Sequence, residues 1–84
     1  MGSLRFEGVR LTAYTMDHEP RHMHGFYAEV EVIADLRLDG SVGLANRTDS
    51  VRPANGSKSD VRHILSGAAR HFEELVLLWE KQHG

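Results

Sequence analysis

The sequence predicts an α+β protein, an antiparallel β-meander of three to four strands packed against one long C-terminal α-helix. Two patterns support this prediction. Over much of residues 4–45, apolar residues alternate with polar ones, which is typical of strands with one buried face. From about residue 59 to residue 83, apolar residues recur at the three- and four-residue spacing of a helix. With 84 residues the chain has room for one domain, and we expect residues 1–84 to form it.

The strands are expected in the first half of the chain. Residues 9–15 alternate between apolar and polar side chains, and residues 24–34 form the clearest strand of the sequence. The alternation in this second strand places His24 and Phe26 on the same face as Val30. We therefore expect His24 at the edge of the core, and the two glutamates of the other face in solvent.

A hairpin is expected at Asp39-Gly40, a dipeptide that favours tight turns between strands. A two-residue turn there would put Val42 on the opposite face from Leu36. A three-residue loop over residues 38–40 pairs Leu36 with Val42 and keeps the apolar residues on one face. The sequence therefore predicts the three-residue loop, with Gly40 in the left-handed conformation that it requires.

The second half of the chain begins with a polar linker, residues 46–58, which has almost nothing apolar to anchor it. We expect residues 48–57 to be mobile. The helix is expected to start near Ser59-Asp60, where either side chain can cap it. Its apolar stripe comprises Val61, Ile64, Leu65, Ala68, Phe72, Leu75, Val76 and Trp79.

Several helix residues lie off this stripe. His63 and His71 are expected in solvent, and Gly67 has no evident reason beyond close packing against the sheet. Leu77 and Leu78 also fall away from the stripe, and exposed leucines of this kind often mark a partner surface. We therefore expect self-association or a protein partner at the C-terminal half of the helix.

Composition excludes several classes of function. The chain has no cysteine, so disulfides, zinc–thiolate sites and thiol catalysis are excluded. Its net charge is −2, whereas strong nucleic-acid binders are usually basic. We therefore do not expect nucleic acid as a partner. No apolar run is long enough for a membrane span. We expect a soluble, cytoplasmic protein with no membrane partner.

The stretch D-H-E-P-R-H-M-H-G-F, residues 17–26, holds three of the six histidines. His22 and His24 are two residues apart, so on a strand both point to one face, a common geometry for two imidazoles on one divalent metal ion. Asp17 or His18 could supply a third ligand across the turn at Pro20. The interpretation that we favour is structural, with the histidines hydrogen-bonded to backbone and carboxylates, and it needs no cofactor.

A catalytic role is the third alternative for this stretch. Small ribonucleases use histidine together with arginine or tyrosine as acid, base and phosphate clamp. Tyr14, Arg21, His22 and His24 could take those parts. The acidic net charge argues against it, because such enzymes need positive potential to hold RNA.

The chain resembles domain-of-unknown-function family 4160. The resemblance rests on Tyr14, on the D-H-x-P-x-H-x-H stretch and on a closing helix with E-L-x-x-x-W-E, and it covers most of the chain. The matching residues are Tyr14, Asp17, His18, Pro20, His22, His24, Glu74, Leu75, Trp79 and Glu80. The resemblance implies a small bacterial protein whose gene lies beside that of a second small protein, in a toxin–antitoxin-like pair. It implies no established activity.

From the residues and this resemblance, we expect a small bacterial interaction or regulatory module with no enzymatic activity of its own. The alternative is a histidine-based metal-binding protein or a small nuclease that uses residues 17–24. Stoichiometric binding of zinc, nickel or manganese would separate the two.

Overall fold

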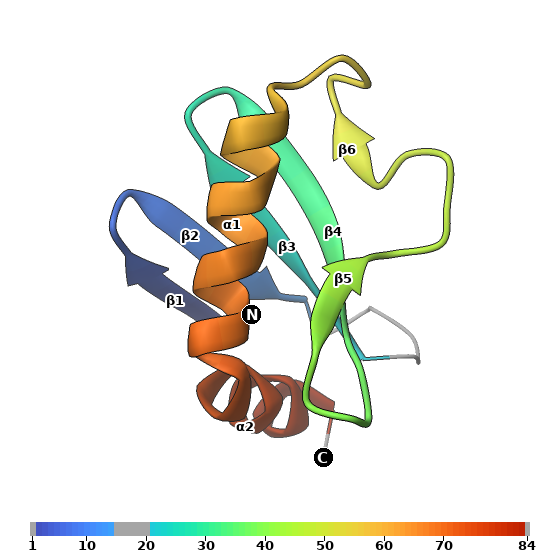
Figure 1. The fold of residues 1–84 in the computed structure, drawn as a ribbon. Coiled ribbons are helices and arrows are strands. Elements are labelled where there is room, and N and C mark those ends of the chain that lie inside the picture. Colours follow the sequence, from blue (N-terminus) through green and yellow to red (C-terminus); the bar gives the residue numbers. More distant parts are fainter. Residues whose placement is uncertain (1, 15–20, 84) are drawn as a thin grey trace.

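The computed structural model describes residues 2–14 and 21–83, which form one layer of strands and a layer of helices packed on one of its faces (Figure 1). Its elements, in chain order, are β1 (Gly2–Phe6), β2 (Val9–Ala13), β3 (His22–Tyr27), β4 (Val30–Leu36), β5 (Val42–Leu44), β6 (Val51–Arg52), α1 (Lys58–Arg70) and α2 (Phe72–His83). The strands form one antiparallel sheet in the order β1-β2-β3-β4-β5, and β6 pairs with the other half of the same edge of β4.

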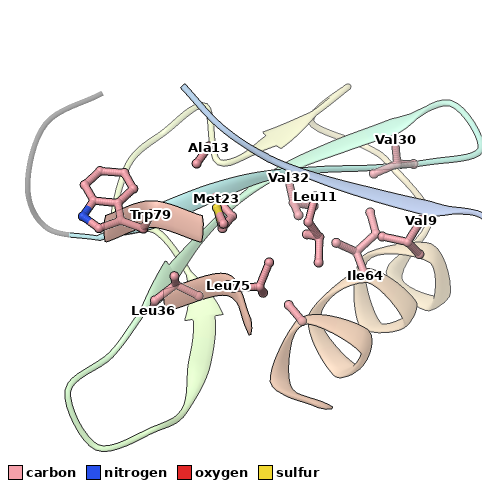
Figure 2. Close-up of a cluster of buried hydrophobic side chains, with 11 residues drawn as sticks. Val9, Leu11, Ala13, Met23, Val30, Val32, Leu36, Ile64, Leu75 and Trp79 are labelled. Atoms are coloured by element: carbon pink, nitrogen blue, oxygen red, sulfur yellow. The ribbon is translucent and has the colours of Figure 1, made fainter. Parts of the chain in front are cut away.

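The helices cover one face of the sheet, and no helix of the described residues lies on the other face. In Figure 1, α1 runs across the front of the sheet, and α2 continues from its lower end in a different direction. The core lies between these layers, as Figure 2 shows for its main side chains. The buried apolar residues of this core are Val9, Leu11, Ala13, Met23, Val30, Val32, Leu36, Ile64, Ala68, Leu75 and Trp79. The α+β class is therefore confirmed.

The predicted strand count of three to four is too low, first because the N-terminal segment forms a strand. β1 pairs with β2 along its whole length, and Phe6 lies opposite Val9. The two turn residues, Glu7 and Gly8, both have positive φ values, 47° and 81°. Two-residue turns of this kind match the twist of the adjoining strands. The sequence alternation before Val9 was too short to predict this strand.

The expected strand over residues 24–34 is wrong, because it is two strands joined by a turn at Ala28 and Glu29. Tyr27 lies opposite Val30 in a two-residue hairpin. A two-residue turn preserves the alternation along the sequence but exchanges the faces, because side chains that lie opposite each other share a face. His24 and Phe26 therefore lie on the face opposite Val30, away from the helices.

The β4–β5 hairpin confirms the predicted register. Leu36 lies opposite Val42, and Arg37 and Ser41 close a three-residue loop through a backbone hydrogen bond of 2.9 Å. Gly40 has a φ of 88°, as the loop requires. The hydroxyl and the amide of Ser41 both donate to the carboxylate of Asp39, which fixes the loop from within.

The predicted single helix is also wrong, because it breaks at His71 (φ −111°, ψ 25°). A straight helix over residues 58–83 would be about 39 Å long at 1.5 Å per residue. The longest dimension of the molecule is 34 Å. The break allows α1 to bury Ile64 and α2 to bury Trp79 against the same short sheet.

Gly67 has a specific packing reason. A Cβ atom at this position would clash with Cε2 and Cζ of the Phe6 ring. The aromatic ring therefore packs directly on the helix backbone, and it also contacts the imidazole of His71, with 4.4 Å between ring centroids. His71 and His63 are half-buried, so the prediction that they are solvated is wrong for both.

The linker over residues 46–58 contains a short strand, which the sequence did not predict. β6 pairs with β4, and Val51 packs against the core. Asp49 binds Arg47 (2.5 Å) and Arg52 (2.8 Å), and these hydrogen bonds, that from Arg47 first, lower the pKa of Asp49 to about 2. The helix starts at Lys58, one residue earlier than expected, and the side chain of Ser57 accepts the N–H of Asp60 as its cap.

Candidate functional sites

The histidine stretch contributes two described histidines to the face without helices. His22 and His24 lie two residues apart on β3, and their ring centroids are 5.5 Å apart. The strand geometry therefore places both imidazoles on one side, as the sequence predicted.

Further groups surround this pair. Tyr14, just after β2, meets the ring of His24 edge-on, with 4.8 Å between centroids. The ring of Trp79 lies 5.3 Å from that of His22. Nδ1 of His24 lies 3.4 Å from Oε2 of Glu31, and the two side chains are 16% and 28% exposed. These contacts define one group of side chains, which we call the histidine cluster. It comprises Tyr14, His22, His24, Glu31 and Trp79.

Arg21 does not join the histidine cluster through the contacts seen here. Its Nε donates to the carbonyl of Leu36 (3.4 Å), its Nη2 to the carbonyl of Arg37 (3.5 Å), and its guanidinium lies 5.9 Å from the centroid of Phe72. This side chain ties the start of β3 to the end of β4. The phosphate-clamp role that the catalytic alternative would give Arg21 has no support in these contacts.

The predicted metal ligands are only partly described. Asp17 and His18 lie outside the described residues. Within residues 2–14 and 21–83, no three His, Cys, Asp or Glu side chains are grouped so that they could hold a metal ion. The pair His22 and His24 therefore offers two imidazole ligands, and metal binding by this pair stays a prediction.

Sequence reasoning missed Glu31 and Trp79 as neighbours of the histidines. Glu31 comes near His24 only because the turn at residues 28–29 folds β4 back on β3. Trp79 comes near His22 because the helix breaks at His71 and α2 turns toward the end of β3. Trp79 did stand among the residues of the family resemblance, which was the one available signal.

A second candidate site is a groove between α1 and β5. Its volume is about 400 Å³, and its lining comprises Val42, Lys58, Val61, Arg62, Leu65, Ser66 and Ala69. The floor is apolar and partly exposed, whereas Lys58 and Arg62 bring positive charge to it. We call this the β5–α1 groove.

The strand beside this groove has a free edge. β5 ends the strand order, and it pairs with β4 through residues 41, 43 and 45 on one side. Because backbone groups alternate in direction along a strand, Val42 and Leu44 turn their N–H and C=O groups to the other side. Among the described strands, none pairs with that side.

The helix surface predicted to bind a partner is only partly exposed. Leu77 is 66% exposed on α2, as expected. Leu78 instead packs against the core, beside Gly2 of β1, so the prediction that it faces solvent is wrong. Single exposed leucines are common on soluble proteins. Leu77 alone therefore gives little support to a partner surface on α2.

Comparisons with protein-family models, with curated proteins and with solved structures gave no match to this chain. Among the described residues, no helix has the length and apolar character needed to span a membrane.

Proposed function

We propose that this protein is a small, non-enzymatic interaction module that binds an extended segment of a partner protein in the β5–α1 groove. The observation that carries the proposal is the free edge of β5 beside an apolar groove. An extended peptide can add to such an edge as a further strand, and its alternate side chains then enter the groove. The small second protein of a toxin–antitoxin-like bacterial pair, which the family resemblance implies, is the partner that we propose.

The groove also restricts the kind of segment that fits. Val61 and Leu65 on α1 contact every second side chain of an added strand, so apolar residues are expected at alternate positions. Lys58 and Arg62 lie along the same wall. Because opposite charges steer association, acidic residues should flank the apolar ones.

Selection from a library of displayed random peptides tests this function. Enriched peptides should combine alternate apolar residues with acidic ones, and their binding should shift the amide resonances of residues 42–44 and 58–69. N-methylation of alternate peptide residues should abolish binding in one register, because it removes the backbone donors that pair with β5. Peptides that tolerate every N-methylation would contradict strand addition.

Two matched variants locate the binding surface. Leu65→Lys places a charge in the groove, whereas Leu77→Lys makes the same change on α2, outside it. We expect the first to weaken peptide binding at least tenfold and the second to leave it unchanged. The reverse result would move the interaction to the C-terminal half of the helix region, as the sequence alone suggested.

The second candidate function is histidine-based, and the proximity of His22 to His24 favours it. A metal ion that binds only the folded protein raises the melting temperature by mass action. Zinc should then raise that of the wild type by several degrees and leave the double variant His22→Ala/His24→Ala unchanged. Equal melting curves for the wild type with and without zinc, nickel and manganese would exclude it. A nuclease role would further require RNA cleavage that the same double variant loses.

A further inference from the structure

Two arginines lie directly opposite each other on the face without helices. Arg5 of β1 pairs with Arg10 of β2, and both side chains are exposed. Like charges in directly opposite positions destabilise a sheet. The carboxylate of the intervening turn, Glu7, binds Arg70 of α1 instead (3.0 Å). Within residues 2–14 and 21–83, neither Arg5 nor Arg10 forms an ion pair, so the repulsion is not offset there.

An aromatic ring lies beside this pair. Phe26 of β3 is directly opposite Arg10, and the guanidinium of Arg10 lies 4.5 Å from the centre of its ring. Phe26 also separates two surface hollows. One, of about 550 Å³, is lined by Arg5, Arg10 and the turn between β1 and β2, and the other, of about 430 Å³, by Glu31 and Arg52.

These three side chains define the chemistry of a ligand. Arg5 and Arg10 line the same hollow, where two guanidinium groups match the oxygens of a phosphate, to which arginine donates several parallel hydrogen bonds. The partly exposed ring of Phe26 and the guanidinium plane of Arg10 can both stack on a flat heterocycle. Glu31 lies opposite Phe26 on β4, where a carboxylate can accept the N–H donors of a base.

We propose that Arg5, Arg10 and Phe26 bind a nucleotide, with its phosphate on the two arginines and its base against Phe26. An acidic peptide fits less well, because it has no flat heterocycle to place against Phe26 and because the second hollow holds two carboxylates, Glu29 and Glu31, beside the single cation Arg52. The net charge of −2 disfavours a long polyanion, so the site holds one or two nucleotides. This inference does not depend on the β5–α1 groove, which lies on the other side of the sheet.

Amide chemical shifts under titration test the proposal. The probes are adenosine monophosphate, inorganic phosphate, a four-residue thymidine oligonucleotide and a glutamate-rich peptide. Adenosine monophosphate should shift resonances of residues 5, 10 and 26 and bind at least tenfold more tightly than phosphate alone. An oligonucleotide that binds no more tightly than the mononucleotide identifies a free nucleotide as the ligand, and one that binds at least tenfold more tightly identifies the end of a single strand.

Variants assign the two parts of the ligand. Arg5→Gln and Arg10→Gln should each weaken nucleotide and phosphate binding at least fivefold. Phe26→Leu should weaken only the ligands that carry a base. Arg37→Gln, an exposed arginine at the β4–β5 hairpin, is the matched control and should change neither. Failure of the nucleotide to outcompete phosphate, equal losses with Arg37→Gln, or tighter binding of the acidic peptide would each overturn the proposal.

Discussion

The two faces of the sheet differ in how deeply their side chains are buried and in which groups they present for binding. On the covered face, Leu11, Met23 and Val32 are fully buried under the helices. The other face has a small buried centre, Thr12 and Ile33, but most of its other positions carry polar or partly exposed side chains, among them arginines, histidines, carboxylates and Phe26. The comparison indicates that packing on one face supplies most of the stability. The other face is then free to carry groups that cost stability and suit binding.

β3 shows the contrast within one strand. Met23 and Gly25 face the helices and are buried, whereas His24 and Phe26 face away from them and are partly exposed. Gly25 leaves room for Ile64 of α1, because a Cβ atom there would lie 2.5 Å from a methyl group of that residue. One strand therefore takes part both in close packing against α1 and in both candidate sites of the face without helices.

The largest expected loss of stability follows removal of the tryptophan at the end of the core. Trp79 is 2% exposed and joins α2 to the sheet. Trp79→Ala should lower the free energy of unfolding by about 3–5 kcal/mol, the usual range for large buried aromatic residues. Urea denaturation measures it. A loss below about 1 kcal/mol would mean that α2 contributes little to the core.

The next prediction compares the two faces of β3 directly. Met23→Ala on the covered face should cost about 2–5 kcal/mol, because it removes a fully buried side chain. Phe26→Ala, three positions along the same strand on the other face, should cost less than about 1 kcal/mol, as is usual for surface positions. Equal losses in urea denaturation would show that both faces stabilise the fold alike and would end the contrast.

A smaller effect is expected where α1 touches β1. Gly67→Ala gains about 1 kcal/mol of helix propensity, but the new methyl group meets the ring of Phe6. Overpacking of this kind costs about 1–3 kcal/mol, so the variant should be less stable than the wild type or at best equal to it.

The same change in a second background isolates the cause. In a Phe6→Ala protein the ring is gone, so Gly67→Ala should then stabilise by up to about 1 kcal/mol. The sign change between the two backgrounds, measured as a double-mutant cycle, is the result that we expect. A gain in both backgrounds would mean that the ring moves aside and that the close contact does not restrict residue 67.

The sequence predicted those parts of the fold whose determinants are local. The β4–β5 register follows from the dipeptide Asp39-Gly40 and from the apolar residues on each side of it. The turn at Ala28 and Glu29 has no such chemistry, and Ala28 adopts a φ of 53° that its side chain disfavours. Alternation continues across a two-residue turn, so the pattern alone cannot distinguish one long strand from a hairpin.

The same limit applies to the candidate sites. The proximity of His22 to His24 follows from their spacing on one strand. The positions of Glu31 and Trp79 depend on a turn and on a helix break, which are set by tertiary packing. Arg5 and Arg10 were also beyond sequence reasoning, because their pairing requires β1, and neither arginine belongs to a recognisable motif.

The smallest expected effect concerns the exposed linker, where charge rather than packing orders the chain. Arg47 and Arg52 hydrogen-bond to Asp49 and lower its pKa to about 2. A carboxylate whose pKa is lower in the folded state stabilises that state above its unfolded pKa, near 4, and loses this contribution as the pH falls through 2.

NMR titration of the carboxyl carbon of Asp49 should therefore give a midpoint near 2. Asp49→Asn should increase the mobility of residues 46–52 at pH 7 and remove its dependence on pH between 4 and 2. A midpoint near 4 would mean that these ion pairs do not persist in solution and that the linker is as mobile as its composition predicts.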